Sequence, residues 1–243
     1  MSKFSLPTET IELPSKGLLY PEDSELAKGI IEMKYMTAKE EDILTNQSYI
    51  QKGTVIDKLM KSLIISKIDY NQLLIGDKNA LMVAARVLGY GKDYKFTYNG
   101  EEHEVDLSLL DNKKINKDII NSKRTNEFNF KLPHSGNEIT FKLLTHKDEI
   151  DITRELEGLK KINKNASPEL TTRLKYLITS VNGERDKKDI RDFIDNYLLA
   201  RDSRALREHT KTIQPDIDLT FFPEENESGI NIPIGINFFW PDA

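Results

Sequence analysis

The sequence contains no cysteine. This absence excludes disulfides, cysteine-ligated zinc or iron–sulfur centres, and a cysteine nucleophile. Histidine is scarce as well, and the histidines do not share the short spacings that metal ligands on one element require; they are His103, His134, His146 and His209. We therefore expect no metal site and no bound cofactor.

Long apolar runs are also missing, since no stretch approaches the roughly 18 residues that a membrane-spanning helix needs. The first residues lack the charged head and apolar stretch of a secretory signal, so we expect folding in the cytoplasm and no membrane partner. The formal net charge of -5 argues against a general nucleic-acid-binding surface. With 243 residues, 38% of them hydrophobic, the chain can bury the core of one or two domains.

Familiar catalytic motifs do not occur in the sequence. Gly89, Gly91 and Lys92 lack the full spacing of a phosphate-binding loop and suit the end of a helix better. Neither a nucleophile elbow nor a metalloprotease motif is present. Paired acids such as Glu101 and Glu102 lie beside turns or at element ends, where acids are common, and do not identify a hydrolase dyad. We expect no enzymatic activity.

One stretch of the chain occurs twice. Residues 73–98 return as residues 198–222, with several times more identities than chance would give. The identical pairs in the gapless alignment are Leu73/Leu198, Leu74/Leu199, Asp77/Asp202, Ala80/Ala205, Leu81/Leu206, Asp93/Asp218 and Phe96/Phe221. Such a match favours a duplicated unit over unrelated helices.

Two shorter matches precede this stretch in the same order. Residues 30–41 resemble residues 138–149, and residues 61–66 resemble residues 175–180. We predict an α+β protein in which a unit of one strand, several helices and a closing hairpin is duplicated. Coincidental amphipathic patterning is the alternative. The predicted divisions are an extended arm at 1–29, a first repeat at 30–110, a linker and hairpin at 111–137, and a second repeat at 138–243.

Each predicted repeat has a capping box where its strand meets its first helix. In the first, the Thr37 hydroxyl accepts from the backbone of Glu40, whose carboxylate reaches back. In the second, Thr145 and Asp148 occupy the corresponding positions, and the shorter acid should reach back less well. These residues predict strand-to-helix junctions, not binding sites.

Asp77 and Asp202 precede the duplicated helices. Each carboxylate is expected to act as an N-cap that accepts hydrogen bonds from first-turn amides. The first helix has apolar residues all round and should be buried, with Gly89 and Gly91 ending it. The second keeps Leu206 inward but shows charged residues on its outer face, as a surface helix does.

Other elements follow from local signals. Asn99 and Gly100 favour a tight hairpin turn. We also predict a helix at 54–65, a hairpin from 128–132 and 138–144, and a helix from Pro168 to Val181. The basic segment 111–124 is interpreted as a solvated connecting helix, with contact to nucleic acid or an acidic partner as the alternative.

The predicted arm carries grouped apolar residues, Leu18, Leu19 and Tyr20. Its prolines and glycines break regular structure, so these side chains require cover from elsewhere. Two interpretations remain open: the arm wraps its own chain, or it docks on a neighbouring protein.

The end of the chain alternates between apolar and other residues. The alternation predicts a strand from Ile230 to Trp240, in which Phe238 and Trp240 share the core face and the Phe239 ring points away from it. Because aromatic side chains often anchor interfaces, Phe238, Phe239 and Trp240 are candidate partner-binding residues, together with the apolar group of the arm. Coverage of the exposed ring by that arm is the alternative.

Three segments carry a resemblance to a known family. Residues 12–44, 73–91 and 232–243 resemble a protein family of T-even-type tailed bacteriophages that comprises baseplate hub subunits. Some members of that family carry cysteine pairs near the first hairpin, whereas residues 95–107 of this chain have none. The resemblance therefore implies no zinc site here.

The resemblance implies a non-enzymatic phage tail protein needed to assemble the central hub of the baseplate. It would be assembled in the host cytoplasm, reside in the virion tail, and contact other hub or tail proteins, with the tape-measure protein among the candidates. A lasting structural subunit and a transient chaperone that leaves before the virion is complete both fit. A tail-associated peptidoglycan hydrolase is a third, less favoured candidate, because it requires a catalytic pair.

Overall fold

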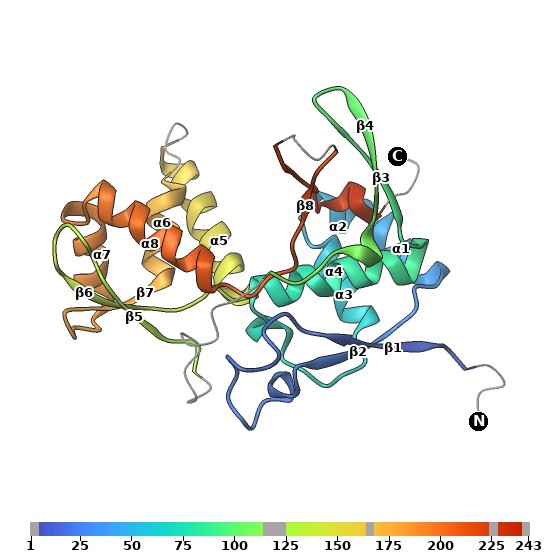
Figure 1. The fold of residues 1–243 in the computed structure, drawn as a ribbon, viewed down its shortest axis with the longest axis horizontal. Coiled ribbons are helices and arrows are strands. Elements are labelled where there is room, and N and C mark those ends of the chain that lie inside the picture. Colours follow the sequence, from blue (N-terminus) through green and yellow to red (C-terminus); the bar gives the residue numbers. More distant parts are fainter. Residues whose placement is uncertain (1–4, 114–124, 164–167, 224–227, 240–243) are drawn as a thin grey trace.

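The computed structural model describes residues 5–113, 125–163, 168–223 and 228–239. These residues form eight α-helices and small antiparallel sheets, so the predicted α+β class is confirmed. Most of the basic segment 111–124, and Trp240, lie outside the described residues. The elements gather in two lobes, which we call the first half and the second half (Figure 1).

The first half is built around a long central helix. Its elements are β1 (Thr8–Glu12), η1 (Glu25–Lys28), β2 (Ile30–Lys34), α1 (Ala38–Leu44), α2 (Gln47–Gln51), α3 (Val55–Leu63), η2 (Tyr70–Gln72), α4 (Ile75–Tyr90), β3 (Asp93–Tyr98), β4 (Glu101–Asp106) and η3 (Leu107–Leu109), where η denotes a 3-10 helix. As predicted, α4 is buried over most of its circumference.

The second half contains one three-stranded sheet and four helices. Its elements are β5 (Phe128–Lys131), β6 (Glu138–Phe141), α5 (His146–Ile162), α6 (Glu169–Leu177), β7 (Ile178–Val181), α7 (Lys187–Asn196) and α8 (Ala200–Ile213). The chain then returns to the first half, where β8 (Thr220–Phe221), β9 (Ile230–Asn231) and η4 (Ile236–Phe239) lie near the β3–β4 hairpin (Figure 1).

The strand order is similar in the two halves. In the second half it is β5-β6-β7. In the first half β1 pairs with β2, and Met33 of β2 forms a bridge with Ile64, just after α3. The equivalent helices α4 and α8 bury the aligned residues Leu81 and Leu206 completely. These parallels favour the duplication, which stays a prediction.

Residues 8–29 are not a free arm. β1 pairs along its whole length with β2. Buried apolar side chains follow it, namely Leu13, Leu19, Tyr20 and Leu26. Of the two interpretations drawn from the sequence, wrapping around its own chain is therefore the one seen for this segment.

The predicted terminal strand is wrong in its length. β9 ends at Asn231, and the chain forms the 3-10 helix η4 after Pro233 and Gly235. Successive side chains of a 3-10 helix do not alternate between opposite faces as they do in a strand. Phe238 and Phe239 are consequently both buried, so the expectation that the Phe239 ring points away from the core is also wrong.

Several local predictions are confirmed. Asn99 and Gly100 have positive φ angles of 50° and 88° in the β3–β4 turn, as a type I′ turn requires. The helix predicted at 54–65 is α3, and the hairpin predicted in the linker is β5–β6. The helix expected to reach Val181 instead ends at Leu177, where β7 begins and pairs with β6.

Candidate functional site

Asp77 is a buried acceptor of long-range hydrogen bonds, not the predicted N-cap. α4 begins two residues earlier, at Ile75, so Asp77 lies within its first turn. One carboxylate oxygen accepts from the Ser15 N–H at 2.9 Å, and the other accepts from the Ser15 and Tyr20 hydroxyls, both at 2.6 Å. Burial raises the pKa of Asp77, although these hydrogen bonds oppose the rise.

Asp202 departs from the N-cap prediction in the same way. It lies in the first turn of α8, which begins at Ala200, and accepts from the backbone N–H groups of His134 and Ser135 at 2.8 and 2.9 Å. Burial works to raise its pKa, but these hydrogen bonds outweigh burial and the pKa is lowered. An N-cap and a long-range acceptor look alike in a sequence, because both place an acid near a helix start.

The two aspartates hold turns that share a motif. Ser15 belongs to Leu-Pro-Ser-Lys-Gly between β1 and β2, and Ser135 to Leu-Pro-His-Ser-Gly between β5 and β6. The glycines that close them, Gly17 and Gly136, have φ angles of 73° and 71°. This Leu-Pro-x-x-Gly pair is the signal that sequence analysis missed, and we call each arrangement a turn latch.

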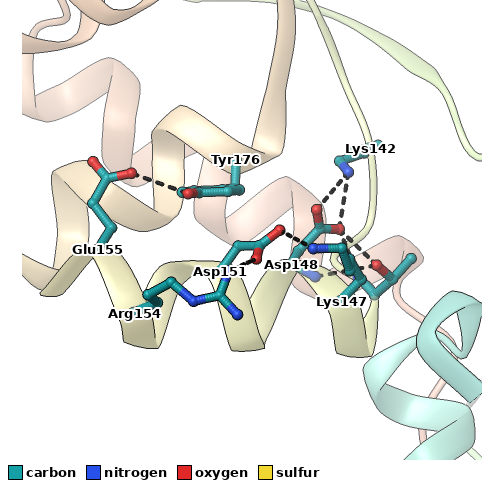
Figure 2. Close-up of polar contacts among 8 residues, drawn as sticks. Lys142, Lys147, Asp148, Asp151, Arg154, Glu155 and Tyr176 are labelled. Carbon is teal, nitrogen blue, oxygen red and sulfur yellow. Dashed lines mark hydrogen bonds and ion pairs between the residues drawn. The ribbon is translucent and has the colours of Figure 1, made fainter. Parts of the chain in front are cut away.

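The capping boxes are confirmed at Thr37 and Thr145. The Thr37 N–H donates to Glu40 at 3.1 Å, and the Thr145 N–H donates to Asp148 at 2.9 Å, so the shorter acid does not reach back less well. Each acid also binds a lysine from the preceding strand segment. The Lys34–Glu40 and Lys142–Asp148 distances are both 2.7 Å, and Figure 2 shows the second pair.

A series of ion pairs and hydrogen bonds runs along α5 (Figure 2). Asp151 binds Lys147 at 2.7 Å and Arg154 at 3.0 Å, and Glu155 accepts from the Tyr176 hydroxyl at 3.0 Å. Lys147 and Arg154 are largely exposed, so these contacts resemble an ordinary solvated helix surface and indicate no binding site by themselves.

A more enclosed polar cluster joins the two halves. It contains Asp57 of α3, Tyr70 of η2 and Lys78 of α4 from the first half, with His146 of α5 from the second. Lys78 Nζ lies 3.0 Å from Asp57 Oδ1 and 3.1 Å from His146 Nδ1, while His146 Nε2 lies 3.2 Å from Asp57 Oδ2. Asp57, Lys78 and His146 line a pocket of about 470 Å³.

Hydrogen-bond chemistry determines which ring nitrogen of His146 carries the hydrogen. The Lys78 ammonium can only donate, so Nδ1 of His146 accepts and Nε2 carries the hydrogen that faces Asp57. Nδ1 is thus engaged by Lys78, whereas Nε2 lies 3.2 Å from Asp57 Oδ2 without a well-aligned hydrogen bond, and the side chain is 4% exposed. An imidazole held in this way cannot accept a proton from a substrate until these contacts break. The cluster is therefore better suited to fastening the two halves than to catalysis.

The same contacts control the charge on Asp57. Burial pushes its pKa up, but the contact with His146 and the charge of Lys78 lower it to about 2. Asp57 is consequently ionised at neutral pH and forms an ion pair with Lys78 where the two halves meet. No sequence pattern predicted this cluster, because its members come from four separate elements.

The predicted partner-binding residues lie mainly inside the fold. Leu19 and Tyr20 are buried, and Leu18 is half-buried. Phe238 packs edge-to-face against Tyr94, with ring centroids 4.8 Å apart. These aromatic side chains and Phe239 stabilise the chain's own core, and Trp240 lies outside the described residues.

An open strand edge remains at the surface. Tyr98 pairs with Glu101 across the turn, and the Leu107 N–H donates to Lys92 O, so the backbone groups of Lys95 and Thr97 face away from β4. No described segment pairs with them. This edge borders a groove of about 940 Å³ whose other wall is formed by residues 233–238.

The three segments that carry the family resemblance meet around α4. The Tyr20 hydroxyl accepts from the Leu74 N–H at 2.9 Å and donates to Asp77. η4 packs against α4 from the other end of the chain. These segments thus belong to one packed unit.

Comparisons with family models, curated proteins and solved structures find no match to this chain. Within the described residues, no helix is long and apolar enough to cross a membrane, and no group of three or more acidic or histidine side chains could hold a metal ion.

Proposed function

We propose that this chain is a non-enzymatic bacteriophage tail protein that helps to assemble the central hub of the baseplate. It acts through contacts with other hub or tail proteins and stays in the virion as a structural subunit. The observation that carries this proposal is the resemblance of residues 12–44, 73–91 and 232–243 to the T-even-type hub family. The three segments pack around α4, so they belong to one unit of structure.

Two features support a role in protein contacts. The outer edge of β3 offers the unpaired backbone groups of Lys95 and Thr97, and such an edge can accept a strand from another chain. Two aromatic residues near this edge are also exposed: Tyr98 is 46% exposed and Phe222 is 59% exposed. Exposed aromatic side chains of this kind are frequent anchors at protein interfaces.

Quantitative mass spectrometry of purified virions from the phage that encodes this protein tests whether the protein stays in the virion. A structural subunit gives peptides of this chain in a fixed ratio to other baseplate proteins. Detection in infected cells but not in virions would instead establish the transient chaperone. Normal baseplates in a phage that lacks the gene would overturn both roles.

The non-enzymatic part of the proposal has its own test. Purified chain is run in a gel that contains peptidoglycan, beside a lysozyme standard. We expect no cleared band from the refolded chain, because Nδ1 of the buried His146 is held by Lys78 and the acids of the turn latches are bound internally. A cleared band that depends on folded chain would support a tail-associated hydrolase.

A further inference from the structure

A third hollow, of about 290 Å³, lies between α6 and α8, and we call it the α6–α8 slot. It is separate from the β3 groove and from the His146 cluster. The slot is lined by aliphatic side chains of both halves, namely Ile75, Leu144, Leu170, Leu174 and Leu177. Leu170 is 45% exposed although it sits among these apolar neighbours. The slot therefore presents an apolar lining to solvent.

The rim of the slot is charged, and its charge is mainly positive. Glu149, Arg173, Arg207 and Lys211 contribute to it. Arg173 is neutralised within the chain, because its guanidinium donates to both Glu149 carboxylate oxygens, at 2.6 and 3.0 Å.

Arg207 and Lys211 make no direct ion pair with a carboxylate among the described residues. Both are exposed on α8, and within the described part of the chain neither forms an ion pair; Glu208, whose charge acts on both, is itself paired with Arg204 at 2.8 Å. The only hydrogen bond of the Arg207 side chain there goes to the Ser203 carbonyl, at 3.3 Å. Residues four apart on a helix lie on one face, so the two cations form a single edge of the slot. This edge contrasts with the net charge of -5 of the whole chain.

We propose that the α6–α8 slot docks an acidic amphipathic segment of another protein. Aliphatic or aromatic side chains of that segment enter the apolar slot, and its carboxylates pair with Arg207 and Lys211. The volume is suitable, because a cavity of about 150 Å³ can hold a benzene ring, so the slot admits about two such side chains. The proposal rests on the proposed function for the identity of the partner, and it adds the partner's chemistry.

Charge complementarity selects this occupant. A basic segment would be repelled by Arg207 and Lys211, while a purely apolar segment would leave both cations unpaired beside the interface. A nucleic acid could pair with the cations but would not fill an aliphatic slot with its phosphates. An acidic segment with large apolar side chains satisfies both parts of the site.

The test uses a yeast-displayed library of random peptides of about 12 residues, selected on the purified full chain. We expect the selected peptides to combine Asp or Glu with Leu, Ile or Phe, and to bind less tightly as salt concentration rises. Leu170→Glu and the double variant Arg207→Glu/Lys211→Glu should each weaken binding by about tenfold or more. The control is Arg201→Glu, which reverses one charge on α8 outside the slot lining and should leave binding unchanged.

Three results would overturn the proposal. Selected peptides without acidic residues would remove its charge argument, and equal binding to wild type and both slot variants would place the contact elsewhere. A wild-type dimer in sedimentation that Leu170→Glu dissociates would show that a second copy occupies the slot. Unchanged melting temperatures establish that the variants are folded. The peptide selection needs no phage, so it can succeed even if the virion experiment overturns the proposed function.

Discussion

The carboxylate of Asp77 holds both the backbone N–H and the hydroxyl of Ser15, although 62 positions separate the two residues in the sequence. The contact fixes the turn after β1 against the start of α4. Asp202 makes the corresponding contact in the second half, but the two environments differ. Ser15 is fully buried, whereas His134 and Ser135 lie in an exposed turn.

This difference predicts unequal effects of the same substitution. Asp77→Ala leaves the buried donors of Ser15 and Tyr20 unsatisfied and should lower the free energy of unfolding by about 3 kcal/mol. Asp202→Ala should lower it by only about 1 kcal/mol, because water can reach the freed N–H groups. Urea denaturation of both variants measures the difference. Equal losses would show that the two latches are equally accessible to water.

The His146 cluster predicts that two carboxylates of equal exposure contribute unequally to the stability of the fold. Asp57 and Asp151 are each 25% exposed, but Lys78 and His146 beside Asp57 are far more buried than the partners of Asp151. Asp57→Asn leaves the enclosed Lys78 ammonium without its counter-charge and should lower the free energy of unfolding by about 2 kcal/mol at pH 7.

Asp151→Asn is the matched control for that prediction. It removes only contacts to exposed cations, so its effect should stay within about 0.5 kcal/mol. Thermal and urea unfolding of both variants provide the measurement. If Asp57→Asn is as mild as its control, the cluster does not fasten the two halves.

Glu40 gives a prediction for acid stability. Burial tends to raise its pKa, but hydrogen bonds from Lys34, Thr37 and Ser62 lower it to about 2. A carboxyl whose pKa is depressed on folding adds stability above its ordinary value near 4.5, and this stability is lost as the pH falls toward 2. We expect the wild type to lose up to about 3 kcal/mol through Glu40 across this interval.

Glu40→Gln is the variant that isolates this titration. Its free energy of unfolding should be lower than that of the wild type at pH 7, and the gap should narrow as the pH approaches 2. Urea unfolding at several pH values measures the gap. A gap that stays constant over the interval would mean that the pKa of Glu40 is not depressed in the folded chain.

Local signals predicted much of the fold. The capping boxes at Thr37 and Thr145 and the turn at Asn99 and Gly100 were predicted correctly, because neighbours in sequence determine them. The end of the chain was mispredicted because periodic apolar residues suit either a strand or a packed irregular segment, and Pro233 interrupts strand pairing.

Long-range contacts could not be predicted in the same way. Whether an acid at a helix start binds its own helix, as expected for Asp77, or a distant turn depends on which segments the fold brings together. The His146 cluster depends on the docking of the two halves, and no spacing in the sequence encodes it. The paired Leu-Pro-x-x-Gly motifs were the available signal, and they become informative only when the strands before them are aligned.

The two latch glycines provide the sharpest test of this interpretation. Both have positive φ angles, of 73° at Gly17 and 71° at Gly136, so alanine is strained at either position by about 1 kcal/mol. Their surroundings differ. A Cβ atom at Gly17 would lie 2.4 Å from the Ala27 carbonyl oxygen, whereas one at Gly136 would meet nothing within 4 Å.

Gly136→Ala should therefore lower the free energy of unfolding by about 1 kcal/mol, from backbone strain alone. Gly17→Ala should lower it by about 3 kcal/mol or more, because the backbone of residues 27–29 must also shift to relieve the overlap. Urea unfolding of the two variants under one set of conditions measures both losses. Losses of similar size would mean that the first turn is not packed against the end of η1, and that the two latches have the same open environment.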